Sequence, residues 1–433
     1  MLYRFSAKVL RTRCLHTTPV QEADKAYKFV VVGAGTGGLA VSSALGRKFG
    51  AGNVAVIEPS EVHYYQPMWT LVGAGVKTLQ QSSKHMADVM PPQVDWIKQR
   101  VAGFMPEKNT VTLADNTKLQ YDYLVVALGL QVNFNQVKGL PEALEDPDSG
   151  VSSNYSAKYV EKTYGNLRKF KGGNALFNLP PMPIKCPGAP QKIMYLVDDY
   201  LRLNGLRDKT TITYNTPLGV IFGVKKYADS LMKVIDRKGI KVNFKRKILE
   251  VRGDKKEAVF EFLDNGVQEV YKYDMMHAVP PMGPLDVMKG SPLCDQQGWV
   301  DVNKETLQHA KYSNVFAIGD CTNIPTSRTA AACAAQAAVL RQNLFSVMKG
   351  AELTAKYDGY ASCPLITGYG KTILAEFDFD GKPLETFPFD QGKERRSMYH
   401  LKKDAMPQLY WYGLIRGVWN GPKLVRDIMH FWK

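Results

Sequence analysis

The chain has 433 residues, of which 45% are hydrophobic and 22% are charged, and its formal net charge is +15. This length exceeds a single hydrophobic core and predicts two domains with a smaller addition. The composition argues against an intrinsically disordered chain. The positive charge by itself would allow nucleic acid, an acidic partner or an anionic membrane, but no zinc-finger, RNA-binding or helix-turn-helix motif supports nucleic acid, and we expect none to bind.

Residues 1–21 have the composition of a mitochondrial transit peptide. No acidic residue precedes Glu22, and basic residues interrupt every apolar run, namely Arg4, Lys8, Arg11 and Arg13. A secretory signal would need an uninterrupted apolar region instead. We therefore expect residues 1–21 to direct import into mitochondria, with a disordered basic tail as the alternative.

A glycine-rich turn follows the first expected strand, residues 28–32. The turn reads Gly33-Ala34-Gly35-Thr36-Gly37-Gly38, helix-forming residues continue to Arg47, and a second apolar strand at 54–57 is followed by Glu58. This pattern predicts a dinucleotide site. Gly33 permits the tight turn, Gly35 lets a pyrophosphate approach the backbone, and Gly38 lets the helix lie close to its strand. The helix N-terminus faces the anion, and Glu58 can accept hydrogen bonds from ribose hydroxyls.

Two later segments extend this domain. Residues 121–129 are expected to form a strand that ends in a turn, after short β segments between 100 and 119, and residues 314–320 form another buried strand that ends in Asp320. An alanine-rich helix begins near Arg328. These segments resemble the two-dinucleotide-domain flavoprotein superfamily, in which the late Gly-Asp reaches the ribityl chain of FAD.

That resemblance implies an α/β protein with two Rossmann-like three-layer domains. The FAD-binding domain is discontinuous, with its first part at residues 28–145 and its second part at 290–350. The second domain, at 150–285, is inserted between them. Residues 351–433 form a C-terminal segment.

The inserted domain alternates strands and helices but lacks a second phosphate-binding loop. Strands are expected at 175–179, 210–214 and 275–279, and helices at 191–203 and 225–238. The first of these strands runs into residues 180–190, which contain five prolines. Prolines lack the N–H groups that cradle a pyrophosphate, so this segment argues against NADH as the reductant and offers Cys186 in its place.

Two of the six cysteines stand out. There is no C-x-x-C and no paired metal spacing, so we expect neither a disulfide framework nor a metal site. Cys186 follows Lys185 and precedes a helix start near Pro190, and both a positive neighbour and a helix N-terminus favour a thiolate. Cys363 lies in what reads as a turn-forming stretch before a proline. We interpret the others beyond the transit peptide as structural, namely Cys294, Cys321 and Cys333.

Several segments together carry a closer resemblance. They are the turn at Gly33, Lys185-Cys186-Pro187-Gly188-Ala189-Pro190, Gly319-Asp320-Cys321-Thr322-Asn323, and Ser362-Cys363-Pro364-Leu365 followed by Glu385-Thr386-Phe387-Pro388-Phe389-Asp390. They resemble the mitochondrial sulfide:quinone oxidoreductase family over essentially the whole chain after the transit peptide.

The resemblance implies a redox pair, Cys186 and Cys363, bridged by sulfur near FAD. Hydrogen sulfide would attack the bridge at Cys363 and leave a persulfide there, and two electrons would pass from Cys186 through FAD to ubiquinone. The persulfide sulfur would go to an acceptor such as glutathione or sulfite. Many bacterial members carry a third cysteine after the strand that here ends at Gly129, but residues 130–135 contain none, which favours two-cysteine chemistry.

The resemblance also assigns residues to the FAD site. These are Thr36, Gly37, Glu58, Gln66, Val101, Asp320, Arg328, Thr329, Ala330 and Ala331. The glycines, Glu58 and Asp320 also follow from the residue patterns, whereas Gln66 and Val101 rest on the resemblance alone.

The chain from residue 393 onward mixes bases with aromatic side chains. Nine Lys and Arg stand against three Asp and Glu, and the apolar residues are Tyr410, Trp411, Tyr412, Leu414, Ile415, Val418, Trp419, Phe431 and Trp432. Such a mixture suits a lipid interface, with an ordinary helix packed on the body as the alternative. We expect peripheral attachment to an anionic membrane, on the matrix side of the inner mitochondrial membrane. Removing the residues after about Asp404 should then abolish attachment and leave FAD bound.

Three other functions remain open. A type II NADH:quinone oxidoreductase would need a second glycine loop, and a non-catalytic flavin-binding mitochondrial factor would need neither Cys186 nor Cys363. A soluble sulfide dehydrogenase that reduces a cytochrome fits poorly with the aromatic, basic C-terminus. The sequence does not assign the sulfur acceptor, the quinone pocket, the oligomeric state, the cleavage site or any covalent link to FAD.

Overall fold

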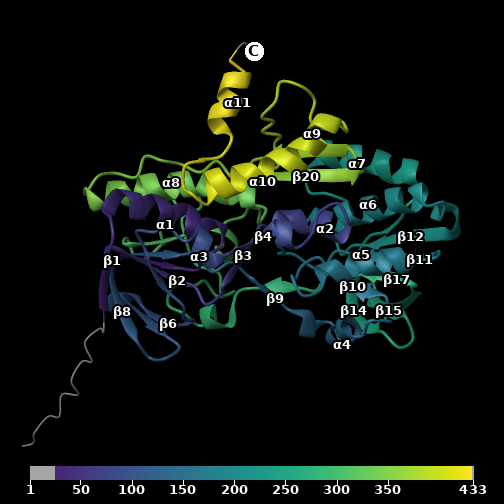
Figure 1. Ribbon diagram of the computed structural model, residues 1–433, viewed down its shortest axis with the longest axis horizontal. Helices are drawn as coiled ribbons and strands as arrows, with labels where there is room; N and C mark the ends of the chain where they lie inside the picture. Colours follow the sequence, from purple (N-terminus) through teal and green to yellow (C-terminus); the bar gives the residue numbers. More distant parts are fainter. Residues whose placement is uncertain (1–24, 432–433) are drawn as a thin grey trace, which may run out of the picture.

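The computed structural model describes residues 25–431, so the expected transit peptide at 1–21 lies outside the described residues. Two α/β lobes lie side by side, and the C-terminal segment runs along one long edge of both (Figure 1). Among residues 25–431, no helix has the length and apolar character needed to cross a membrane.

The first lobe is built on a seven-stranded sheet in the order β5-β2-β1-β8-β7-β6, with β19 paired to β8. Its strands are β1 Lys25–Val32, β2 Val54–Ile57, β5 Asp95–Ile97, β6 Val101–Met105, β7 Thr110–Leu113, β8 Lys118–Val126 and β19 Val315–Ala317. The late strand β19 pairs in parallel with β8, with Val315 opposite Leu124. This pairing confirms that the first domain is assembled from two separated parts of the chain.

Helices α1 Thr36–Phe49 and α8 Ala330–Met348 lie next to each other in the first lobe (Figure 1). The turn before α1 depends on its glycines. Gly33 has φ +99°, and a Cβ there would lie 2.5 Å from Ala127 O. A Cβ on Gly38 would lie 1.8 Å from Gly33 O, so α1 can lie this close to β1 only with glycine at that position.

The second lobe contains a parallel sheet in the order β10-β17-β11-β12-β13. Its elements are β10 Val151–Ser152, α5 Val160–Lys169, β11 Gly173–Asn178, α6 Ala189–Leu203, β12 Thr210–Asn215, α7 Lys225–Lys238, β13 Lys241–Asn243 and β17 Met275–His277. An antiparallel sheet adds β14 Arg246–Arg252, β15 Glu257–Phe262 and β16 Gln268–Lys272, and the short ladder of β9 Gln131–Val132 with β18 Met282–Gly283 flanks the insertion. The predicted inserted α/β domain is confirmed.

The remaining elements connect the two sheets and follow them in the chain. Between β2 and β5 lie β3 Val62–Tyr64, α2 Trp69–Gly73, β4 Ser83–His85 and α3 Met86–Val89, and α4 Leu140–Glu145 follows β9. After α8 come the hairpin β20 Ala361–Gly368 and β21 Lys371–Phe377, then α9 Arg396–His400, a π-helical turn Leu401–Ala405, α10 Met406–Gln408, a second π-helical turn Leu409–Leu414, and α11 Lys423–Met429.

The turn expected around Cys363 is wrong, because Cys363 lies inside strand β20. All eight residues of β20 are buried. Among residues 25–431, strand β20 pairs only with β21 in a two-stranded sheet, so Pro364, which lacks an N–H, is tolerated there.

The apolar residues of the C-terminal segment differ in burial, and Trp419 is half-buried against the core. Four of those expected at a lipid interface are buried against the protein body, which corrects that expectation: Tyr410, Trp411, Leu414 and Ile415. Others are exposed, namely Tyr412, Val418, Leu424, Ile428 and Phe431, while Trp432 lies outside the described residues. The buried group is held down because Arg47 and Arg341 donate hydrogen bonds to the carbonyls of residues 416 and 417.

Candidate functional site

A cavity of about 430 Å³ lies where the glycine turn, the proline-rich loop and the C-terminal segment meet. Most of the predicted site residues line it: Gly35, Thr36, Gly37, Glu58, Gln66, Cys186, Asp320, Arg328, Thr329, Ala330 and Ala331. Four do not. Gly33 and Gly38 lie behind the turn, Val101 begins β6 away from the wall, and Cys363 is buried behind wall residues Ser362 and Pro364.

The wall of this cavity leaves polar atoms unpaired. Within residues 25–431, Thr70 Oγ1, Asn154 Nδ2 and Ser362 Oγ are buried without a hydrogen-bond partner, and all three residues line the cavity. Buried polar groups in folded proteins are nearly always paired. The wall therefore fits a ligand that carries polar groups of its own.

The end of the cavity at α1 fits an anion. Among the described residues, nothing lies within 4 Å of a Cβ built on Gly35, and no side chain caps α1, so its first N–H groups face open space. Glu58 holds the turn in place, because its Oε2 accepts a hydrogen bond from Ala34 N at 2.9 Å. Both features fit the pyrophosphate and ribose of a dinucleotide.

The N-terminus of α8 forms another part of the wall. Thr329 Oγ1 caps this helix by accepting from Ala332 N at 3.1 Å. Arg328 donates from Nε to Asp320 O at 3.0 Å, and its own carbonyl accepts from Cys186 N at 2.9 Å. These bonds join the Asp320 turn, the start of α8 and the cysteine loop, which the sequence predicted separately.

The two predicted redox cysteines meet at the inner end of the cavity. Their Sγ atoms are 4.0 Å apart. A disulfide bond measures about 2.05 Å, and because divalent sulfur is bent, two such bonds through one bridging sulfur span roughly 3.3 Å, so the Sγ atoms need to approach by less than ~1 Å to take up one additional sulfur atom. Cys186 has φ +50°, a left-handed backbone that costs energy for a residue with a side chain and is typical of functional sites.

The positive partner of Cys186 is Lys192, not Lys185. Lys192 Nζ donates to Cys186 Sγ at 3.3 Å from the first turn of α6, whereas Lys185 Nζ donates to Gln66 Oε1 at 2.8 Å. The hydrogen bond with Cys363 and the charge of Lys192 hold the pKa of Cys186 well below its usual range. The same hydrogen bond and burial raise the pKa of Cys363. The pair is therefore asymmetric, with the stabilised thiolate on Cys186.

A second lysine, which no sequence pattern singled out, lies on the wall near the cysteines. Lys402 is 3% exposed and donates from Nζ to Pro67 O at 2.8 Å. Burial and the charge of Lys192 lower the pKa of Lys402 to about 7. It comes from the π-helical turn Leu401–Ala405, a backbone form that is rare and frequent at functional sites.

The buried C-terminal residue Tyr410 reaches the glycine turn. Burial lowers the pKa of His63 to about 4, so its ring is neutral. Its Nδ1 lies 3.1 Å from Ala34 O, which can only accept, and therefore Nδ1 carries the proton. Its Nε2 then accepts from Tyr410 Oη at 2.7 Å, and Tyr410 in turn accepts from Thr36 Oγ1 at 3.0 Å. The Thr36 hydroxyl is thus engaged, and its backbone N–H is the group left for an anion.

Comparisons with known proteins decide between the readings of the sequence. The family described as pyridine nucleotide-disulphide oxidoreductase matches residues 27–164 and 203–337. A mitochondrial sulfide:quinone oxidoreductase of Mus musculus is 52% identical over 417 residues, which are 96% of this chain and 92% of the relative. The chain belongs to the sulfide:quinone oxidoreductase family. Another mitochondrial member, from Schizosaccharomyces pombe, is 39% identical over 423 residues, 92% of each chain.

A solved structure agrees in fold. The sulfide:quinone oxidoreductase of Aquifex aeolicus has a TM-score of 0.74 and 18% identity, and the match covers 94% of this chain and 95% of that one. Membership of the family makes the chain a flavin-dependent oxidoreductase. It favours this function over the NADH-dependent enzyme, the non-catalytic factor and the soluble dehydrogenase that the sequence left open.

Proposed function

We propose that the chain oxidises hydrogen sulfide by two electrons at Cys186 and Cys363 and delivers the electrons to ubiquinone, with FAD as its flavin. The observation that carries this proposal is the pair of Sγ atoms 4.0 Å apart, with Lys192 3.3 Å from Cys186, at the end of a cavity with a dinucleotide turn. Membership of the sulfide:quinone oxidoreductase family supports the same substrates.

The FAD would be held by residues from both parts of the first domain, 28–145 and 290–350. Gly35, Thr36 and Gly37 would face the pyrophosphate with backbone N–H groups, and Glu58 would face a ribose. From the second part, Asp320 and residues 328–331 line the same cavity. When bound, FAD supplies a two-electron acceptor that can be reoxidised by a quinone. Gln66 lies on the wall of the cavity and Val101 does not.

The cysteines come from the other two parts of the chain, 150–285 and 351–433, and their asymmetry gives the sulfur chemistry a direction. With one sulfur bridging the pair, HS⁻ attacks Cys363 Sγ, a new S–S bond forms there, and the bond from Cys363 to the bridging sulfur breaks. The leaving electron pair stays on the sulfur attached to Cys186. The sulfur whose anion is better stabilised leaves faster, and Lys192 lies on that side.

The cycle closes when the persulfide sulfur of Cys363 is taken by a nucleophile such as glutathione or sulfite. Cys363 then keeps a thiolate, and a new S–S bond between it and the outer sulfur of the Cys186 persulfide re-forms the bridge. The two electrons released in this step would be accepted by FAD. This release is the oxidation, and the sulfur atom that entered as sulfide leaves on the nucleophile.

We place the protein on the matrix side of the inner mitochondrial membrane, attached to anionic lipid. The exposed apolar residues Leu424, Ile428 and Phe431 occur in and beside α11, together with the exposed Lys423, which suits a lipid interface. In Figure 1 α11 projects away from the body at the edge of the molecule. The mitochondrial relatives and the composition of residues 1–21 support the compartment. No partner nucleic acid is proposed.

An anaerobic titration with sulfide tests this function. The oxidised flavin absorbance should be lost in the wild type and return on addition of a soluble quinone, whereas Cys186→Ser and Cys363→Ser should not respond. Cys294→Ser is the matched control, because Cys294 is remote from the pair, and it should respond like the wild type. If both site variants respond to sulfide like the wild type, the proposed cysteine chemistry is wrong.

A further inference from the structure

The two cysteines are carried by a helix and a strand that lie against each other. Cys186 lies just before α6, and Cys363 is the third residue of β20. A Cβ on Gly188, the residue before α6, would lie 2.5 Å from Cys363 Sγ. The start of the helix therefore rests directly on the strand at the reactive end, and only glycine leaves enough room there.

The far ends of the same helix and strand are also in close contact. A Cβ on Gly368, the last residue of β20, would lie 2.2 Å from Asp199 Oδ2 near the end of α6. Asp199 Oδ2 accepts a hydrogen bond from Tyr369 N at 2.8 Å. Asp199 thus ties the end of the strand to the helix that begins beside the other cysteine.

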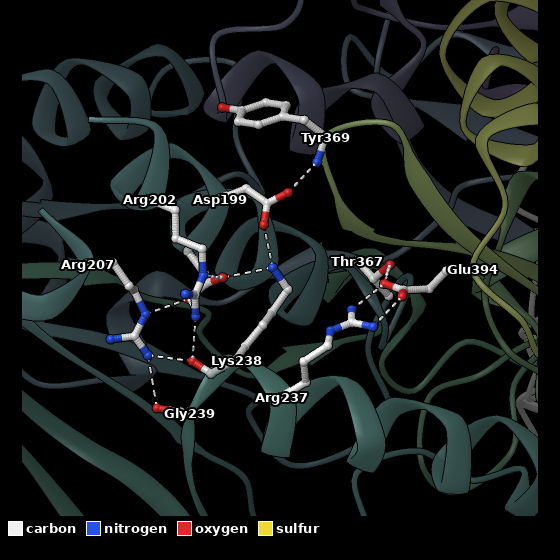
Figure 2. A network of polar contacts seen from close by, with 10 residues as sticks. Asp199, Arg202, Arg207, Arg237, Lys238, Gly239, Thr367, Tyr369 and Glu394 are labelled. Carbon is white, nitrogen blue, oxygen red and sulfur yellow. Dashed lines mark hydrogen bonds and ion pairs between the residues drawn. The ribbon is translucent and has the colours of Figure 1, made fainter. Parts of the chain in front are cut away.

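Figure 2 shows Asp199 between Tyr369 and Lys238, with dashed contacts to both. Lys238 is the last residue of α7 and is 5% exposed, and it also binds Asp198 Oδ2 at 2.7 Å. Because the ammonium is almost buried and has two carboxylate partners, it holds α6 and α7 together.

The same strand end has a second attachment in Figure 2. Thr367 Oγ1 donates to Glu394 Oε1 at 2.6 Å, and Arg237 of α7 binds both oxygens of Glu394 at 2.7 and 2.8 Å. The strand is therefore fixed to α6 and α7 at one end. Because a packed interior transmits strain, this attachment also constrains the other end of the strand and the start of α6, beside which the sulfur atoms lie.

We propose that Asp199 is a positioning residue that holds β20 on α6, so that Cys186 and Cys363 stay too far apart to close directly but near enough for a bridge of one sulfur atom. The inference rests on the proposed function of the pair. Direct closure to a disulfide of about 2.05 Å requires the Sγ atoms to approach by about 2 Å, whereas a bridge of one sulfur, roughly 3.3 Å across, requires less than ~1 Å. The tether opposes the larger approach and permits the bridge.

The rate of direct closure tests the tether. In the holoenzyme with its cysteines reduced, diamide takes two electrons and two protons from the thiols of Cys186 and Cys363, and an S–S bond forms between them. We expect Asp199→Ala to close roughly tenfold faster than the wild type, a factor that corresponds to about 1.4 kcal/mol in the barrier. Mass spectrometry of unreduced peptides measures the fraction closed.

Two variants distinguish loss of the contact between Asp199 and β20 from a general loosening of the surrounding structure. Asp199→Asn retains an oxygen that can accept from Tyr369 N, so its closure rate should return toward that of the wild type. Arg202→Ala removes a charge that binds Asp198 in the same network without touching β20, and it should close at the wild-type rate.

An unchanged rate in Asp199→Ala, or an equal acceleration in Arg202→Ala, would overturn the proposal. If Asp199→Ala does not fold, Gly368→Ala gives the second perturbation, because its methyl group would meet Asp199 Oδ2, and the same acceleration is expected. Insertion of one sulfur into the wild-type pair, after incubation with sulfide and a quinone, is measured separately by peptide mass. If no sulfur is inserted, the proposed sulfur bridge is wrong, but the closure rates still test whether Asp199 positions the strand.

Discussion

Replacing Lys402 with methionine should stabilise the folded protein and slow its chemistry at the same time. Burial and the charge of Lys192 lower the pKa of Lys402 from 10.5 to about 7, against the opposing effect of Cys186 and Cys363. Between these two pH values the unfolded chain binds more protons than the folded one, so stability rises with pH. At about 1.36 kcal/mol per pKa unit, the penalty of Lys402 is roughly 4 kcal/mol at pH 7 and about 2 kcal/mol at pH 9.

Urea unfolding of the wild type and Lys402→Met at pH 7 and pH 9 measures this penalty. The variant should be more stable at pH 7, and its advantage should shrink by about 2 kcal/mol at pH 9. Lys423→Met, at a lysine on the surface of α11, should show no such change with pH. An advantage that stays constant or grows with pH would refute the reasoning. The rate at which sulfide reduces the flavin at pH 7 should also be lower in the variant, because the positive charge of Lys402 near Cys186 is lost.

Three further changes probe the site and the C-terminal segment. Lys192→Met should raise the pH midpoint for alkylation of Cys186 by iodoacetamide by at least about 1 unit, and Lys185→Met should not. Equal shifts in the two variants would show that Lys192 is not the specific partner of the Cys186 thiolate. Tyr410→Phe leaves the buried Nε2 of His63 without a hydrogen-bond partner, at a cost of about 1–3 kcal/mol in stability. Flavin release, measured by fluorescence, should therefore be faster. An unchanged release rate would show that Tyr410 does not support the cofactor turn. Deleting residues 422–433 should release the protein from anionic liposomes with its flavin retained, and continued binding would contradict the assignment of α11 to lipid.

The deletion expected from the sequence, after about Asp404, is not suitable for that last experiment. It would remove Tyr410 together with the buried residues around it, and Tyr410 contacts both His63 and Thr36. The experiment could then not distinguish a direct loss of lipid binding from a loss that follows from the missing flavin. The shorter deletion leaves the buried residues in place.

The elements that could be predicted were those whose residues pack locally. Strand β2 and helix α7 have the expected bounds, because a strand buried on both faces is a continuous apolar run and an amphipathic helix shows its period. The glycine turn was predictable for the same reason, since its requirements lie within six consecutive residues. Strand β20 was not, because Pro364 in its interior reads as a turn former.

The charges around the cysteines depended on the fold. Lys185 is adjacent to Cys186 in sequence, but the left-handed backbone at Cys186 leaves the two side chains with different partners. Lys192 could have been found as a lysine in the first turn of the helix after the cysteine. Lys402 and Tyr410 could not, because Lys402 reaches the cavity and Tyr410 reaches Thr36 from two π-helical turns more than two hundred residues after Cys186 in the chain.

The hydrogen bond from Thr36 to Tyr410 also bears on the order of events during synthesis. The glycine turn leaves the ribosome well before one of its partners, because Thr36 and Tyr410 are separated by 374 residues. Domains fold in order from the N-terminus as they emerge, but this nucleotide turn cannot reach its final arrangement until residue 410 is available. Completion of the cofactor cradle is therefore a late step in assembly, and a chain stalled before residue 410 would present an unfinished one.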